Sequence, residues 1–206
     1  MKKLFFITVV FAVITLIASG NAFPAFAEAA ADKSAGKTLF SFEKDEEGWE
    51  IPDWAYEQDD YVGEEIMVSK NAAKEGESSL KLMVNFPGGK WCGAVTEVME
   101  YFDWTPYSGI SCDIYLPENA PNGLKAKIIL TVSDSWKWTE MSRSYRLAPG
   151  KWTHISANLK PGSTDWKRTK LTDEFRADVR KVAIRLESSK PAYKGPVYID
   201  NIVLSE

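Results

Sequence analysis

Hydrophobic and polar residues alternate in short runs along most of the chain from Thr38 onward. In "SLKLMVNF", residues 79–86, every second residue is a large apolar one, and this period of two is typical of a half-buried β-strand. The runs that share this pattern are "TLFSFE", "GISCDIYL", "LKAKIILTVS", "SRSYRL", "WTHISANL", "VRKVAIRLE" and "VYIDNIVL". They predict a fold built mainly from strands.

Turn signals rich in glycine and proline separate these runs, among them "FPGG", "LPENAPNG", "LAPGKW", "KPGS" and "KPAYKG". About eight to ten strands at this spacing predict two antiparallel sheets packed as an all-β sandwich or jelly roll. One short helix is expected in "LTDEFRADVR", because Thr172 can cap it and Leu171, Phe175 and Val179 recur at helical spacing.

The first 27 residues have the features of a secretory signal peptide. "MKK" is a basic start, an apolar run of about 15 residues follows, and Ala25-Phe26-Ala27 offers a cleavage site. The alternative, a membrane anchor, is disfavoured because a spanning helix needs roughly 20 apolar residues. We therefore expect a secreted or periplasmic protein that is free of the membrane once the signal is removed. Residues 28–37 predict a flexible lead-in, and residues 38–206 a single domain.

Charge and cysteine content narrow the possibilities further. The net charge of −4 and the lack of any basic run give no indication of a nucleic-acid partner, and we expect a monomer. Export permits a disulfide, but spacing does not show whether Cys92 and Cys112 meet. A bridge and two buried thiols both stay open.

Six of the eight tryptophans divide into two groups. Trp49 and Trp152 each stand beside a turn and lead into apolar positions, so we expect them in the core. Trp54 lies in a polar, acidic loop, and Trp91 stands at the mouth of a strand after "FPGGK". These latter two are candidates for a binding surface.

Trp136 and Trp138 form the other candidate pair, in "SDSWKWTEM". If this stretch is extended, both indoles share one face and lie about 7 Å apart. Indole rings stack on the C–H faces of pyranose sugars, so the pair suggests a saccharide platform. We expect Trp136 to face the sugar, with Trp138 either extending the platform or packing down to fix the loop.

Polar side chains on the same strands offer hydrogen-bonding groups. In "VAIRLE", Arg185 and Glu187 stand on the face opposite the apolar residues, and Glu140 and Arg143 also fall on predicted outer faces. A charged outer face of this kind is commonly just solvated. The surplus of aromatic residues beside these groups favours a sugar-binding groove.

Several segments, in this order, resemble the non-catalytic carbohydrate-binding modules with a galactose-binding-like jelly-roll fold. They are "LFSFEKDEEGW", "AAKEGESSLKL", "FDWTPYSGISCDIYLP", "LAPGKWTHISANL" and "VYIDNIVL". Within that superfamily the chain is most similar to the mannan-binding modules of family 27, and next to the β-glucan-binding modules of family 11. The resemblance implies that Trp54, Trp91 and one of Trp136 or Trp138 stack on a polysaccharide in the concave face of a sheet.

The resemblance also implies a structural calcium ion. Glu43 and Asp200 match the usual carboxylate ligands, and carbonyl groups around residues 74–78 are expected to complete the site, since calcium takes hard oxygen ligands. Modules of this kind usually form part of large enzymes, whereas this chain ends at Glu206. The expectation is a glycan binder that acts alone or beside separate enzymes.

An enzyme is the main alternative. The single histidine, His154, stands in a strand, no G-x-S-x-G elbow is present, and the ligands for catalytic zinc are lacking. A jelly-roll glycoside hydrolase or polysaccharide lyase needs only two suitable carboxylates, for which Glu97, Glu140 and Glu187 are candidates. We expect no catalysis. A further alternative is an envelope adhesion or structural protein, whose exposed aromatic residues would meet protein.

Overall fold

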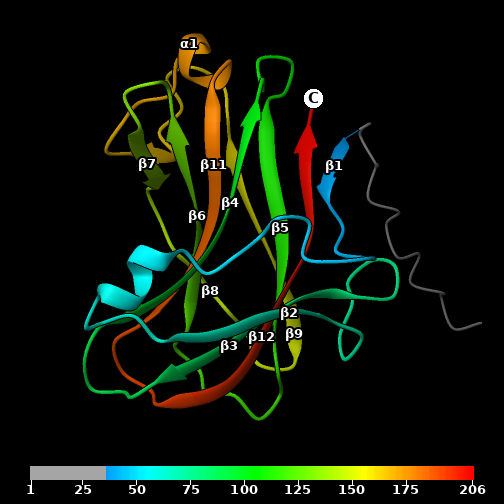
Figure 1. Cartoon of the computed structure of the whole chain (residues 1–206), viewed down its shortest axis with the longest axis vertical. Helices are drawn as coiled ribbons and strands as arrows, with labels where there is room; N and C mark the ends of the chain where they lie inside the picture. Colours follow the sequence, from blue (N-terminus) through cyan, green and yellow to red (C-terminus); the bar gives the residue numbers. More distant parts are fainter. Residues whose placement is uncertain (1–35) are drawn as a thin grey trace, which may run out of the picture. The chain divides into compact units, whose positions relative to one another are not determined.

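The computed structural model describes residues 36–206, and these form two antiparallel sheets packed face to face (Figure 1). The predicted all-β sandwich is confirmed. The predicted signal peptide and residues 28–35 of the lead-in lie outside the described residues. The first strand begins at Lys37, one residue before the expected start of the domain.

Sheet A contains six strands, and its strand order is β2-β3-β12-β5-β9. These are β2 (Gly63–Ser69), β3 (Ser79–Phe86), β12 (Tyr193–Ser205), β5 (Gly109–Leu116) and β9 (Lys151–Asn158), with β1 (Lys37–Phe40) paired to β12. The long strand β12 pairs with β3 along its first half and with β5 along its second (Figure 1).

Sheet B also contains six strands, in the order β10-β7-β6-β11-β4. These are β10 (Trp166–Lys167), β7 (Lys137–Met141), β6 (Lys125–Val132), β11 (Val179–Ser188) and β4 (Cys92–Phe102), with β8 (Tyr145–Arg146) paired to β6. Its outer face, which points away from sheet A, carries the site described below.

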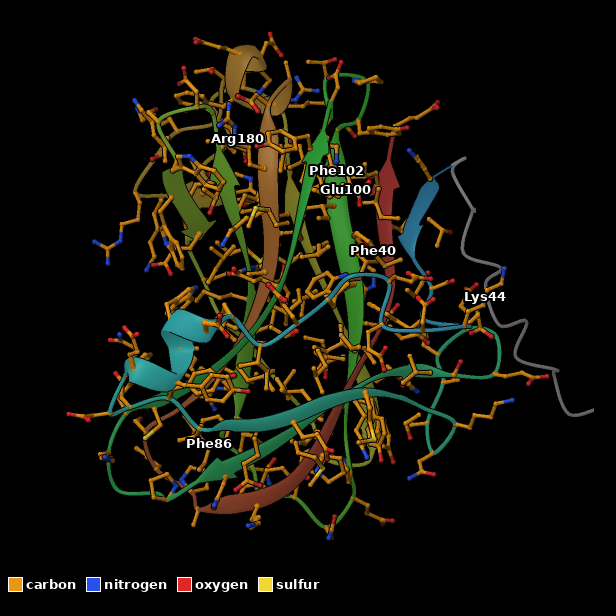
Figure 2. All side chains as sticks on the ribbon, viewed as in Figure 1. Phe40, Lys44, Phe86, Glu100, Phe102 and Arg180 are labelled. Atoms are coloured by element: carbon orange, nitrogen blue, oxygen red, sulfur yellow. The ribbon has the colours of Figure 1, made fainter. Side chains whose placement is uncertain are left out.

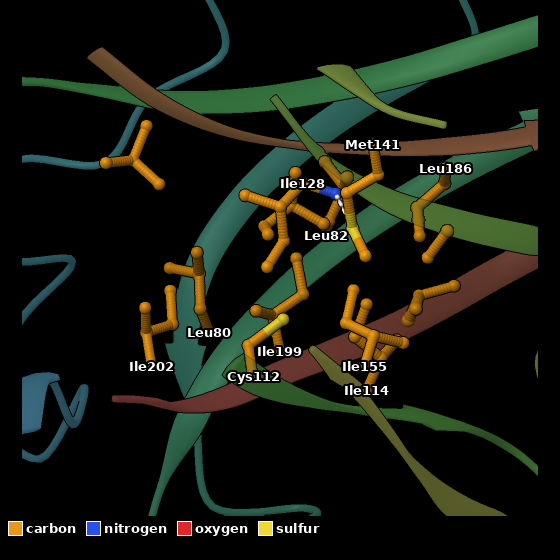
Figure 3. Packing of buried hydrophobic residues seen from close by; sticks show 14 of the residues in the cluster. Leu80, Leu82, Cys112, Ile114, Ile128, Met141, Ile155, Leu186, Ile199 and Ile202 are labelled. Carbon is orange, nitrogen blue, oxygen red and sulfur yellow. Dashed lines mark hydrogen bonds between the residues drawn. The ribbon is translucent and has the colours of Figure 1, made fainter. Parts of the chain in front are cut away.

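The core between the sheets is built from the alternating apolar positions that the sequence predicts. Figure 3 shows Leu82 and Ile199 of sheet A packed with Ile128 and Leu186 of sheet B, and all four side chains are fully buried. Each fully buried side chain of this size contributes about 1.5–3 kcal/mol to folding. Trp49 also lies in this core, as predicted.

The two cysteines face the core from different sheets, Cys92 from β4 and Cys112 from β5, and both are free, buried thiols. Of the two possibilities left open by the sequence, the structure therefore has the unbridged one. Burial raises the pKa of the Cys112 thiol well above its ordinary value.

Trp152 corrects the expectation of a core position. Its side chain is half-buried on the outer face of sheet A, where its ring lies 5.4 Å from that of Tyr115. The register pairs Trp152 with Tyr115, and His154, two residues along, with Asp113. Because alternate residues of a strand share a face, the same outer face carries all four.

Helical structure is limited to two short elements within residues 36–206: the 3-10 helix η1 (Asp53–Glu57) and the helix α1 (Asp173–Arg176). The predicted cap is confirmed, since the Thr172 hydroxyl accepts a hydrogen bond of 3.2 Å from the Phe175 amide. Neither helix is long and apolar enough to cross a membrane.

Candidate carbohydrate-binding face

A pocket of about 200 Å³ opens on the outer face of sheet B. It joins side chains from four parts of the chain: the loop around η1, the start of β4, β7 and β11. The residues that line it are Trp54, Gln58, Asp60, Tyr61, Trp91, Gly93, Val95, Trp138 and Arg185. Three of the four predicted tryptophans therefore meet here, and each leaves more than a third of its surface exposed.

Trp54 is presented by the short helix η1. The buried side chain of Ala55 anchors this helix in the core, and the Ala55 amide donates a hydrogen bond of 2.9 Å to the Pro52 carbonyl. Trp54, the residue before Ala55, keeps 41% of its surface exposed. A small apolar anchor thus places a large apolar ring at the pocket.

Trp91 stands immediately before β4, and its ring lies against Gly93. A Cβ atom at Gly93 would come within 3.3 Å of this ring, so glycine leaves the room that the indole occupies. Backbone hydrogen bonds also fix this side of the pocket. The Gly93 amide donates to the Asp60 carbonyl, and the Gly93 carbonyl accepts a hydrogen bond from the Val62 amide. Trp91 is 46% exposed.

Tyr61 closes one side of the pocket. Its hydroxyl donates a hydrogen bond of 3.0 Å to the Val95 carbonyl, and burial raises the pKa of this phenol. The ring packs on Val95, Ile129 and Ala183, which form a small buried apolar floor on the outer face of sheet B. Sequence reasoning missed Tyr61, whose only signal was its place at the end of an acidic loop.

Trp136 and Trp138 do not both line the pocket, and the stretch that holds them is not extended as the expected platform requires. The residues before β7 form a turn in which Ser133 and Trp136 have φ values of 64° and 52°. This left-handed backbone at Trp136 breaks the alternation on which a shared face depends. Trp138, inside β7, lines the pocket, and Trp136 does not.

Trp136 instead belongs to a second exposed aromatic cluster. The Arg180 guanidinium lies 5.5 Å from the Trp136 ring and 5.4 Å from the Tyr101 ring. Figure 2 places Arg180 near the upper end of β11, well away from the helix η1, drawn in cyan. The two tryptophans therefore serve different regions of sheet B.

Arg185 connects the pocket to a network of charges. Its guanidinium lies 5.9 Å from the centre of the Trp91 ring and donates a hydrogen bond of 2.8 Å to Glu140. It is also 3.2 Å from the carboxylate of Glu187, which accepts a hydrogen bond from the Ser144 hydroxyl. The predicted Arg185, Glu187 and Glu140 are thus brought together.

Glu140 is the centre of this network, with its side chain only 4% exposed. Lys127, Lys167 and Arg168 lie 3.8, 3.2 and 3.7 Å from its carboxylate. Burial acts to raise the pKa of Glu140, but the positive charges of Arg185, Lys127 and Lys167 outweigh it and hold the pKa below 4.5. Glu140 is therefore ionised at neutral pH.

Lys127 and Lys167 were missed by sequence reasoning. In "LKAKIIL", Lys127 alternates with the buried Ala126 and Ile128, and this pattern alone assigns it to the outer face. The structure buries it there, with 3% of its surface exposed. Lys167 lies opposite Glu140 in the pairing of β10 with β7, a short strand that the sequence pattern did not predict.

Arg143, the remaining predicted polar residue, does not line the pocket. Its guanidinium lies 4.4 Å from the centre of the Tyr145 ring and donates a hydrogen bond to the Tyr145 hydroxyl. That hydroxyl in turn donates to the Ser156 carbonyl of sheet A at 2.9 Å. Arg143 therefore braces the region between the sheets.

The two predicted calcium ligands lie together, in a cavity separate from the tryptophan pocket. Glu43 and Asp200 line one cavity of about 210 Å³, whose other lining residues are Thr38, Ser41, Glu75, Gly76 and Asn201. Burial and the negative charge of Glu43 raise the pKa of Asp200. Two carboxylates that repel each other among hydroxyl and amide oxygens are a donor set that suits a hard cation such as calcium.

Around this cavity the backbone presents N–H donors to the two carboxylates, where carbonyl ligands for the ion were expected. The amides of Lys74 and Glu75 donate hydrogen bonds of 2.7 and 3.1 Å to Asp200, and the amide of Glu77 donates to Glu43. No group of three or more His, Cys, Asp or Glu side chains suited to a metal occurs within residues 36–206. The calcium ion therefore stays a prediction that rests on two carboxylates.

Comparison with known proteins places the fold. No protein-family sequence profile and no curated protein sequence matches the chain. Among solved structures, the chain is similar to a family 27 carbohydrate-binding module of Caldicellulosiruptor saccharolyticus in complex with mannohexaose. The identity is 20%, the match covers 77% of this chain and 90% of that chain, and the TM-score is 0.53.

Two further modules have the same sandwich. A non-crystalline cellulose specific module of family 28 matches with 15% identity over 83% of this chain and 96% of that chain, with a TM-score of 0.61. A family 11 module of Clostridium thermocellum in complex with a β-1,3-1,4-mixed-linked tetrasaccharide matches with 18% identity, 82% and 95% coverage and a TM-score of 0.52. At these identities the comparisons show that the chain has the fold of these modules.

Proposed function

We propose that this protein binds a β-linked polysaccharide, such as β-mannan, glucomannan or β-glucan, and does not cleave it. The observation that carries this proposal is the meeting of Trp54, Trp91 and Trp138 around one pocket. Their indole rings come from three separate segments and stay exposed, although burial of such rings would stabilise the fold. Exposed rings that converge on one site are suited to stack on successive sugar units.

The polar groups of the pocket support this assignment. Gln58, Asp60 and Arg185 stand beside the three indoles and can hydrogen-bond sugar hydroxyls. Arg185 is held by Glu140 and Glu187, so its guanidinium is positioned before a ligand arrives. An aromatic surface with a few fixed polar groups is typical of small-molecule and saccharide sites.

The lowered pKa of Glu140 disfavours a role as the general acid of a glycosidase. A general acid in such an enzyme needs a raised pKa, whereas the surrounding cations lower the pKa of Glu140. Glu97 is bound by Lys181, whose ammonium donates a hydrogen bond to it. These contacts suit a binding surface better than an acid–base pair.

The remaining parts of the proposal follow from the sequence and the fold resemblance. We infer that the protein is exported, acts as a monomer in the secreted or periplasmic space, and holds a structural calcium ion between Glu43 and Asp200. The module of family 27 was solved with mannohexaose, which makes β-mannan the first polysaccharide to test.

Affinity electrophoresis tests the proposal. Glucomannan in the gel should retard the wild-type protein, and Trp91→Ala should abolish this shift. Tyr101→Ala, which removes another exposed ring outside the pocket, is the matched control and should migrate as the wild type does. Full retardation of Trp91→Ala would refute the site, and release of reducing ends or unsaturated sugars would refute the non-catalytic assignment.

A further inference from the structure

The outer face of sheet B carries an excess of positive charge beside the tryptophan pocket. The strand register shows which side chains share this face. Glu140 pairs with Lys167 and with Ile129, and Arg185 pairs with Lys127. In the next row, Glu187 pairs with Lys125, which in turn pairs with Arg146.

Six cations and two carboxylates gather in this region, which we call the basic patch. Its members are Lys125, Lys127, Arg146, Lys167, Arg168 and Arg185, with Glu140 and Glu187. The whole chain has a net charge of −4, so this local excess is opposite in sign to the protein as a whole. The two carboxylates are too few to neutralise it.

Lys127 is only loosely paired within the basic patch. Its side chain is 4% exposed, and its one ion pair, to Glu140, has a length of 3.8 Å. Its ammonium donates no hydrogen bond to any residue within 36–206. Its ammonium therefore keeps donors for oxygen atoms of water or of a ligand.

Lys167 and Arg168 are the members beside Glu140 that a ligand can reach directly. Their side chains are 45% and 70% exposed, yet both lie within 4 Å of Glu140. Glu140 in turn stands two residues from Trp138 on the same face of β7, about 7 Å along the strand. The basic patch therefore adjoins the wall of the pocket that Trp138 forms, whereas the acidic Asp60 lies with Trp54 in the loop around η1.

From this placement we propose that the site prefers an anionic β-linked polysaccharide to a neutral one, with a carboxylate or sulfate group that lies against Lys167 and Arg168 when a neighbouring sugar ring stacks on Trp138. This inference rests on the proposed function and names its substrate class. The charged group completes the basic patch, and the indoles bind the sugar ring itself. The basic patch and the indoles are both needed for selective binding, since cations alone would bind any anion.

A matched set of ligands tests this directly. Mannohexaose, hexa-β-1,4-mannuronate and sulfated mannohexaose have the same linkage and differ in charge. We expect at least one of the two anionic hexamers to bind about ten-fold more tightly than mannohexaose in calorimetric titrations at low salt. The preference should shrink between ~0.02 and ~0.5 M NaCl, because salt screens exposed charges.

Two double variants distinguish an effect of the basic patch from an effect of the protein's net charge. Lys167→Gln with Arg168→Gln should bring the affinities of charged and neutral hexamers to within about two-fold of each other. Lys44→Ala with Lys160→Ala removes the same charge at exposed positions outside the patch (Lys44 in Figure 2) and should keep the preference. The two anionic ligands also distinguish carboxylate from sulfate.

The outcomes divide clearly. Equal or weaker binding of both anionic hexamers than of mannohexaose overturns the inference and leaves the proposed function standing. Loss of the preference in the Lys44→Ala, Lys160→Ala control also overturns it, since net charge would then account for the effect. Absence of binding to all three hexamers, to glucomannan and to β-glucan refutes the proposed function itself.

Discussion

Arg185 on β11 and Glu140 on β7 are joined by a hydrogen-bonded ion pair of 2.8 Å that passes over β6, the strand between them. The pair connects the tryptophan pocket with the basic patch, because Arg185 also lies over the Trp91 ring. Burial of Glu140 means that its charge is compensated by cations and not by water.

Removal of the Glu140 charge should therefore destabilise the fold. Glu140→Gln removes the ion-pair partner of Lys127 and Lys167 and leaves Arg185 with Glu187 alone. We expect the free energy of unfolding to fall by about 3 kcal/mol. Urea unfolding followed by tryptophan fluorescence measures this. Glu77→Gln, which breaks the fully exposed pair with Lys70, is the control and should match the wild type. Wild-type stability of Glu140→Gln would contradict the prediction.

The two neighbouring tryptophans should differ in their effect on binding. Trp138→Ala removes a pocket wall, and we expect it to weaken glucomannan binding by about 2 kcal/mol, or roughly 30-fold in Kd. Trp136→Ala should change the Kd of a short oligosaccharide little, because its ring lies with Arg180 and Tyr101. Titration of each variant with mannotetraose compares their Kd values. A larger loss from Trp136→Ala would reverse the assignment.

The pair of His154 and Asp113 on sheet A should make stability depend on pH. The hydrogen bond with Asp113 raises the pKa of His154 above 6.5. Burial acts to raise the pKa of Asp113, but the hydrogen bonds with His154 and Asn201 outweigh it and hold the pKa below 3.8.

The sign of the pH effect follows from these two directions. The contribution of His154 is present below pH 6.5 and is lost as pH rises through its raised pKa. That of Asp113 is present above pH 3.8 and is lost as pH falls through its lowered pKa. His154→Gln should thus lower the Tm more at about pH 5 than at about pH 9. An equal loss at both pH values would show that the ion pair contributes nothing.

Calcium should stabilise the protein through Glu43 and Asp200. The ion would offset the burial and the negative charge of Glu43, which together raise the pKa of Asp200. Saturation to about 100 times Kd adds about 2.7 kcal/mol. Thermal unfolding in calcium and in EDTA measures this, with magnesium as the control cation. Glu43→Gln, at an exposed position, should remove the response. An identical Tm with and without calcium would show that the backbone amides alone hold the two carboxylates.

Some of the site was predictable because its signal is local. Trp54 lies in an acidic loop and Trp91 follows a turn, so the local sequence indicates that neither ring belongs to the core. Both rings line the pocket. Alternation in "VAIRLE" likewise assigned Arg185 and Glu187 to one outer face, where they form an ion pair of 3.2 Å.

Other residues depended on contacts that no local pattern reports. Lys167 reaches Glu140 only because β10 pairs with β7, and Tyr61 reaches Val95 across 34 residues of sequence. The left-handed backbone at Trp136 removed that ring from the expected platform, although nothing in "SDSWKWTEM" distinguishes it from Trp138.

By itself, the sequence determined most of the strands, although not β2 and β10, together with the all-β class, the Thr172 cap and the exposed character of the tryptophan loops. These features follow from the period of two and from turn chemistry, which act between near neighbours. Only the tertiary structure decided that the cysteines face the core from different sheets, that Trp152 lies on the outer face of sheet A, and that six cations share a face with two carboxylates. The alternation of apolar and polar residues shows which face of its strand a side chain occupies. The pairing of distant strands decides which other side chains lie beside it.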